Sequence, residues 1–218
     1  MTLGNSIDFE KVFKVFRKNY ILVPLEIFGN DPYKTLISTL MSSRTNDSTT
    51  LVAANRLFEK ASNIKKLNDM TIKEIEGLIY PVGFFKTKAK HIKKLTKLIL
   101  KEFKGEIPNT REKLVSLPGV GRKTANLVLN RAFNIPAIAV DTHVHKITNI
   151  LGWVKTTTPE QTESQLTKLL PVKYWPETNR LFVSIGRQFR SQKKLHEFLV
   201  RNGLISEALI SSDRNTKS

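Results

Sequence analysis

Lys123 and Asp141 are the two residues whose types and positions could carry covalent chemistry. Lys123 lies at the start of a predicted helix, two positions after the end of the turn-forming stretch Pro118–Gly121, and Asp141 follows the apolar run Ala137–Val140. The positive end of a helix disfavours an ammonium group, and an uncharged lysine is a nucleophile for Schiff-base formation. Asp141 is either a plain helix N-cap or a carboxylate that acts beside Lys123, and the two roles are compatible.

The residues around Pro118–Gly121 predict a helix, a tight hairpin and a second helix. Asn109 is the expected N-cap of the first helix, and the second helix begins near Arg122. The N–H groups at the start of this second helix form a site for a phosphate anion, which holds a nucleic-acid backbone without reading its sequence. The pattern does not fit a P-loop, because an arginine separates the last glycine from the lysine, nor a dinucleotide-binding fingerprint.

The composition predicts a basic protein without cysteine chemistry. The chain has 36 Lys and Arg against 19 Asp and Glu, a net charge of +17. Nucleic acid is the first partner that such a charge favours, an anionic membrane is the second, and a merely solvated lysine-rich surface is the alternative. Because cysteine is absent, disulfides, iron–sulfur clusters and Cys-based zinc sites are excluded. The histidines lack ligand spacing, so no metal site is expected, and no apolar run approaches the ~20 residues of a membrane span.

Apolar residues recur with helical spacing along most of the chain and predict an all-α fold. The polar end Ser211–Ser218 is expected to fray. The first residues show no basic start followed by an apolar core, so no secretory signal is expected. A cytoplasmic, nucleoid-associated protein is the expectation if the source is prokaryotic. The expected helix N-caps are Asp8, Asp31, Thr71 (in a capping box with Glu74), Thr87 and Thr158.

The stretch LPGVGRKTAN, followed by VLN and IAVDTHV, closely resembles the helix-hairpin-helix and Gly/Pro-Asp motif of the endonuclease III family of DNA glycosylases. DPYKTLISTLMSSRTND and GFFKTKAKHI resemble two further parts of that family, and the similarity extends from about Pro32 to Arg190. The resemblance implies two helical lobes with a DNA-binding cleft between them. One lobe would be a helical barrel over residues 25–135, and the other would join residues 1–24 to residues 136–218.

The same resemblance implies the reaction. A damaged base would be flipped out of double-stranded DNA. Lys123 would then attack the sugar and form a Schiff base, while Asp141 would stabilise the cationic sugar and assist proton transfer. β-Elimination would cut the strand. We therefore expect a monomeric, bifunctional DNA glycosylase and AP lyase that removes oxidised pyrimidines and acts on AP sites.

The resemblance also implies a set of DNA-contacting residues. Arg44 and Phe84 would fill the hole left by the flipped base, although core packing is an alternative for Phe84, and Arg44 replaces the glutamine of many relatives. Lys86 and Lys88 would contact phosphates unless they are solvated surface charges. Related hairpins bind a monovalent ion through their carbonyls, so this hairpin is a candidate for one. The other expected DNA-binding residues are Gly119, Val120, Gly121, Arg122, Thr124 and His143.

One departure from the family is large. Relatives commonly hold a [4Fe–4S] cluster on C-terminal cysteines, whereas the corresponding stretch here, GRQFRSQKKLHEFLV, has none. We therefore expect no cluster and no other redox cofactor. The role of the cluster is either dispensable here or is taken over by packing together with a set of basic residues: Arg187, Arg190, Lys193 and Lys194.

Three alternatives to a bifunctional enzyme remain open from the sequence. A monofunctional glycosylase for adenine or mismatched thymine shares the fold but usually lacks the lysine found here at position 123. A glycosylase for alkylated bases is the second alternative, because the residues of a base pocket are poorly encoded. The third is a non-catalytic helix-hairpin-helix DNA-binding protein, which the joint presence of Lys123 and Asp141 disfavours.

Overall fold

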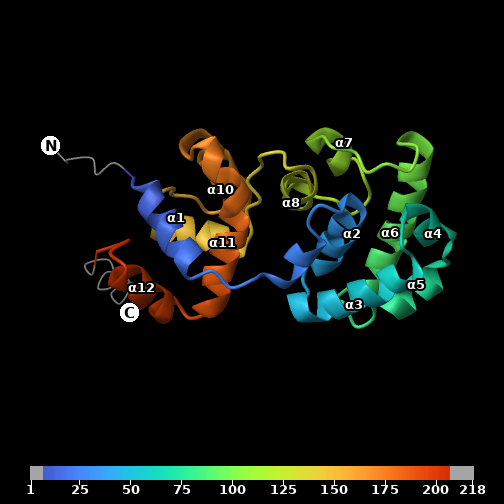
Figure 1. Ribbon diagram of the computed structural model, residues 1–218, viewed down its shortest axis with the longest axis horizontal. Helices are drawn as coiled ribbons and strands as arrows, with labels where there is room; N and C mark the ends of the chain where they lie inside the picture. The colour runs from blue at the N-terminus through green and yellow to red at the C-terminus, as the bar shows by residue number, and fades with distance from the viewer. Residues whose placement is uncertain (1–6, 207–218) are drawn as a thin grey trace. The chain divides into compact units, whose positions relative to one another are not determined.

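The computed structural model describes residues 7–206, and every regular element in that range is a helix (Figure 1). The predicted all-α fold is therefore confirmed for these residues. The chain divides into two compact units, a central unit of residues 23–139 and a terminal unit made of residues 1–22 and 140–218. The predicted boundaries lie within a few residues of these limits. The predicted polar end lies outside the described residues.

The central unit is built from seven α-helices and a short 3₁₀ helix, each of which buries one apolar stripe. These elements are η1 (Pro24–Phe28), α2 (Pro32–Ser42), α3 (Asp47–Lys60), α4 (Ile64–Asp69), α5 (Ile72–Ile79), α6 (Phe85–Glu102), α7 (Arg111–Val115) and α8 (Arg122–Phe133).

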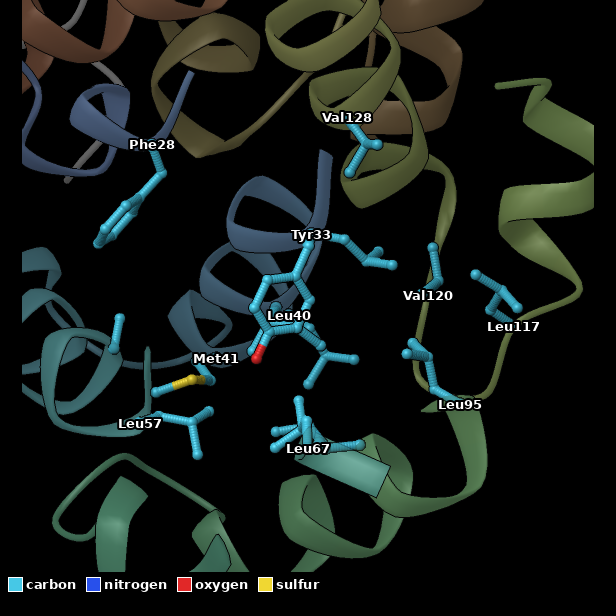
Figure 2. Close-up of a cluster of buried hydrophobic side chains, with 14 of the residues drawn as sticks. Phe28, Tyr33, Leu40, Met41, Leu57, Leu67, Leu95, Leu117, Val120 and Val128 are labelled. Atoms are coloured by element: carbon cyan, nitrogen blue, oxygen red, sulfur yellow. The ribbon is translucent and has the colours of Figure 1, made fainter. Parts of the chain in front are cut away.

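A single apolar cluster fills the central unit. Figure 2 shows its side chains converging from α2, α6 and α8 and from the turn between α7 and α8. Leu40, Leu95 and Val128 are at most 3% exposed. Burying a side chain of this size contributes roughly 1.5–3 kcal/mol, so this cluster is what holds α8 and the turn before it in place.

The terminal unit combines the first helix of the chain with the last helices around an aromatic core. Phe13 stacks on Tyr174 at 4.3 Å between ring centroids, and Phe16 meets Phe182 edge-on at 4.9 Å. Edge-on and offset aromatic pairs stabilise the folded chain beyond what the burial of the rings alone contributes. The elements of this unit are α1 (Phe9–Lys18), α9 (Thr142–Ile150), α10 (Pro159–Leu169), η2 (Val172–Tyr174), α11 (Trp175–Gln188) and α12 (Gln192–Arg201).

Most of the predicted N-caps are confirmed, since each side chain accepts a hydrogen bond from a backbone N–H of its helix's first turn: Asp8, Asp31, Thr71 and Thr158. Two predictions are wrong. The hydroxyl of Thr110, not Asn109, caps α7 by accepting from Lys113 N at 3.4 Å. Helix α6 begins at Phe85 rather than after Thr87, because Phe84 adopts a left-handed conformation and turns the chain into the helix.

Candidate functional site

The predicted helix, hairpin and helix are present as α7, a tight turn and α8. Gly119 has a φ of +81°, a left-handed conformation that favours glycine. Leu117 and Val120 point into the apolar cluster near Leu95 (Figure 2), so the hairpin is anchored by its own side chains. Gly121 is the N-cap of α8, and no side-chain hydrogen bond caps the helix there.

The three hairpin residues of the predicted DNA contact differ in exposure. Gly119 and Gly121 are exposed, as a backbone contact requires. Val120 is 5% exposed, and its N–H donates to Leu117 O at 3.1 Å. The side chain and the N–H of Val120 are both used to hold the hairpin, and its DNA-binding role stays a prediction.

The ring of His91, on α6, packs against the hairpin, a contact that the sequence did not reveal. A Cβ atom built on Gly119 would lie 2.7 Å from His91 Nδ1 and 3.0 Å from His91 Cβ. The ring of His91 therefore fills the space that any larger residue at position 119 would need. No local sequence signal could have found this pair, because the two residues are brought together only by the packing of α6 against the hairpin.

Lys123 lies in the first turn of α8 and is exposed, with Arg122 exposed and Thr124 half-buried on either side. The next turn of α8 is buried instead of exposed. Asn126 is fully buried, and its Nδ2 donates to Ile138 O at 2.8 Å. This bond ties α8 to the extended segment that follows it within the central unit.

Asp141 is the N-cap of α9 and is half-buried. Its Oδ1 accepts from His143 N at 3.0 Å and from Val144 N at 2.9 Å. The predicted capping role is confirmed. Both bonds use the same oxygen, so Oδ2 stands outside the capping bonds.

His143 is half-buried and lies against Gly186 of α11, within the terminal unit. A Cβ atom built on Gly186 would lie 2.2 Å from His143 Nδ1 and 2.9 Å from His143 Cβ. Gly186 therefore makes room for the imidazole two residues after Asp141. A glycine inside a helical pattern is the signal that could have indicated such close packing.

Arg44 and Phe84, the two predicted wedge residues, lie together in the central unit. The guanidinium carbon of Arg44 is 5.4 Å from the centroid of the Phe84 ring. Both residues have left-handed backbones, with φ of +54° and +56°. Phe84 is 61% exposed, so the alternative that it is a core residue is wrong. An exposed phenyl ring beside a guanidinium is suited to stacking with bases.

The two predicted phosphate-binding lysines on α6 have different surroundings. Lys86 is exposed. Lys88 is only 6% exposed, and its amine donates to Met41 O at 2.7 Å, to Ser43 O and to Thr45 Oγ1 at 3.2 Å. In this arrangement oxygens of the protein use all three N–H donors of the ammonium, so a phosphate contact by Lys88 would require the amine to leave them, and that contact stays a prediction.

The stretch that corresponds to the cluster region of relatives is packed with aromatic side chains. Phe189 stacks on Phe198 of α12 at 4.3 Å, and Ser191 caps that helix. Residues 7–206 contain no group of three or more His, Asp or Glu side chains that could hold a metal ion. A cysteine-ligated cluster does not fit the residues present, since the chain has no cysteine.

No helix within residues 7–206 is long and apolar enough to cross a membrane.

Known proteins resemble the chain over these elements. A profile of the HhH-GPD superfamily of base excision DNA repair proteins matches residues 37–172. Endonuclease III of Thermotoga maritima is 45% identical over 158 residues, which are 72% of this chain and 74% of that protein. The endonuclease III-like protein 1 of Gallus gallus is 44% identical over 159 residues, which are 72% of this chain but 57% of that protein.

Solved structures give the same answer for the fold. A non-covalent complex of endonuclease III with DNA superposes with a TM-score of 0.77 at 29% identity and covers 94% of this chain and 98% of that one. A trapped covalent intermediate of endonuclease III with DNA gives a TM-score of 0.72 at 29% identity, over 84% of this chain and 88% of that one. This chain therefore belongs to the HhH-GPD superfamily of base excision DNA repair proteins and, within it, to the endonuclease III family.

Proposed function

We propose that this protein is a bifunctional DNA glycosylase and AP lyase that removes oxidised pyrimidines from double-stranded DNA. The observation that carries the proposal is an exposed Lys123 in the first turn of α8, a helix that follows the hairpin and whose N-cap, Gly121, makes no side-chain capping bond. The half-buried carboxylate of Asp141, fixed by two N–H donors, supports it. The hairpin and helix start would hold a DNA phosphate and bring the sugar to the amine.

The chemistry follows from these two groups. Neutral Lys123 Nζ attacks C1′, and the glycosidic bond breaks with its electron pair leaving on the base, which takes up a proton. Asp141 stabilises the positive charge that develops on the sugar and accepts a proton from the lysine nitrogen. The sugar ring then opens: the C1′–O4′ bond breaks with its electron pair on O4′, which takes up a proton, and a protonated imine forms between C1′ and the lysine nitrogen. This imine acidifies the C2′ hydrogen. When that proton is removed, its electron pair forms the C2′=C3′ bond and the 3′ phosphate leaves, so the strand is cut 3′ to the lesion.

The site requires no redox cofactor for these steps, and we propose that the enzyme works without the iron–sulfur cluster of its relatives. The aromatic pair of Phe189 and Phe198 would hold α12 where relatives have cluster-binding loops. Arg44 and Phe84 would fill the hole left by the extruded base.

Borohydride trapping tests the proposal. Duplexes that carry one AP site or one thymine glycol are incubated with wild type, Lys123→Gln and Asp141→Asn, and covalent adducts are separated by denaturing electrophoresis. We expect adducts with wild type on both duplexes, none with Lys123→Gln, and a loss of at least about 100-fold in rate with Asp141→Asn.

The other outcomes are distinct. An adduct on the AP site alone would keep the lyase and remove the assignment to oxidised pyrimidines. Base release without any adduct would make the protein a monofunctional glycosylase with Lys123 as a phosphate-binding residue. If neither base release nor an adduct occurred, the non-catalytic DNA-binding alternative would stand.

A further inference from the structure

Two loops that are far apart in the sequence meet in the central unit, and each carries one wedge residue. The first loop follows α2 and contains Arg44, and the second precedes α6 and contains Phe84. Gly83 N donates to Thr45 Oγ1 at 3.0 Å, and a Cβ atom built on Gly83 would lie 2.6 Å from Arg44 O. The loops are therefore in direct backbone contact, and Gly83 permits the approach.

Lys88 is bonded to both loops. Its backbone N–H donates to Phe84 O at 3.0 Å, in the first turn of α6. Its side-chain amine crosses to the other loop and donates to Met41 O, Ser43 O and Thr45 Oγ1. The acceptors surround Arg44 in the sequence on both sides, so one residue connects the backbone on which Phe84 stands with the backbone on which Arg44 stands.

Where Lys88 meets the two loops, each hydrogen-bond donor has an acceptor. An ammonium has three donors, and Lys88 has three oxygen acceptors. The hydroxyl of Thr45 donates to Ser43 O at 3.3 Å and accepts from Gly83 N and from Lys88. Two of the acceptors are carbonyls at the end of α2, which have no partner within a helix. Removing the amine would take the donor away from the buried Met41 carbonyl and from its part-buried neighbours, which would destabilise the contact between the two loops.

We propose that Lys88 is a positioning residue that holds Arg44 and Phe84 as one rigid wedge. This inference rests on the proposed function, since it assigns a purpose to the wedge of that same DNA glycosylase. Both wedge residues are exposed and have left-handed backbones, which are unfavourable for side chains that are not glycine. Such a conformation persists only where the surroundings hold it. Lys88 is the buried residue that bonds to both loops, through its backbone N–H to Phe84 O and through its amine to the loop that carries Arg44.

The test uses Lys88→Met, which keeps the length of the side chain and removes its donors. The matched control is Lys97→Met, the same substitution at an exposed lysine on the same helix. Single-turnover base release is measured on a duplex with a paired thymine glycol, and borohydride trapping on a single-stranded oligonucleotide with an AP site. The first substrate requires a base to be extruded and its hole filled, whereas the second does not.

We expect Lys88→Met to slow base release from the duplex by about 10- to 100-fold, as a displacement of about 1 Å can do. Trapping on the single strand should change less than about twofold, and Lys97→Met should match wild type on both substrates. In an Arg44→Ala/Phe84→Ala background the effect of Lys88→Met should disappear, because residues that act through each other are not additive.

Equal losses on both substrates, or a full effect of Lys88→Met in the Arg44→Ala/Phe84→Ala background, would overturn the proposal and leave Lys88 a residue of general stability. If Lys88→Met does not fold, Thr45→Val, which removes the shared hydroxyl, takes its place with the same expected pattern. Failure of the proposed function is separate, because wild type would then give no trapped adduct on the single strand. If Arg44→Ala/Phe84→Ala releases the base at the wild-type rate, the wedge and the proposal both fail.

Discussion

Three lysines near the candidate site have the same chemistry and different surroundings. Lys123 is exposed at a helix start, Lys86 is exposed on the side of α6, and Lys88 is buried one turn into the same helix. Burial lowers the pKa of Lys88 from its ordinary value of 10.5 to about 8, because a charged amine loses its hydration. The three oxygen acceptors hold the amine as an ammonium below that pH.

The lowered pKa of Lys88 predicts how stability depends on pH. Between the folded pKa of about 8 and the ordinary value of 10.5, the unfolded chain binds more protons than the folded one at this residue. The free energy of unfolding that Lys88 contributes therefore rises with pH across this window. Urea unfolding of wild type and Lys88→Met at about pH 7.5 and about pH 9.5 should show a larger difference between the two proteins at the higher pH. A difference that stays constant or shrinks would contradict the lowered pKa.

Among the elements, α9 and α11 meet where a glycine faces the ring of His143. Because a Cβ atom on Gly186 would come within 3 Å of both the ring and the Cβ of His143, rotation of the side chain alone cannot make room. The start of α9, with Asp141 as its N-cap, would have to shift.

Gly186→Ala should therefore lower the thermal stability and slow adduct formation on an AP-site duplex. Overpacking of this kind costs about 1–3 kcal/mol. Gly77→Ala, on α5, is the matched control, because a Cβ atom there meets nothing within 4 Å; it should raise stability by about 0.5–1 kcal/mol. The double variant Gly186→Ala/His143→Ala should recover stability relative to Gly186→Ala. Equal stability of Gly186→Ala and wild type would show that α9 adjusts without cost.

At the scale of the whole molecule, the net charge of +17 predicts DNA affinity that falls steeply with salt. Only lysines that reach phosphates contribute to this salt dependence, so substitutions at Lys86 and at Lys88 should change it differently. The plot of log affinity against log salt is measured by fluorescence anisotropy on an undamaged duplex. Lys86→Ala should reduce its slope by about 1, whereas Lys88→Met should leave it unchanged. A reduced slope for Lys88→Met would mean that its amine leaves the loops and reaches DNA.

By itself, the sequence determined the helical class, most of the helix N-caps, the hairpin and the candidacy of Lys123 and Asp141. These features depend on residues within a few positions of one another, where side-chain type and helical period act directly. The tertiary structure alone decided that Lys88 is buried, that Arg44 lies beside Phe84, and that His91 and His143 each lie against a glycine. Such pairs join helices that are distant in the chain. A lysine at the boundary between the apolar and polar faces of a helix gives the same sequence pattern whether its amine is in water or donates to the end of another helix. Only the packing of the folded chain therefore distinguishes a solvated lysine from a buried one that joins two loops.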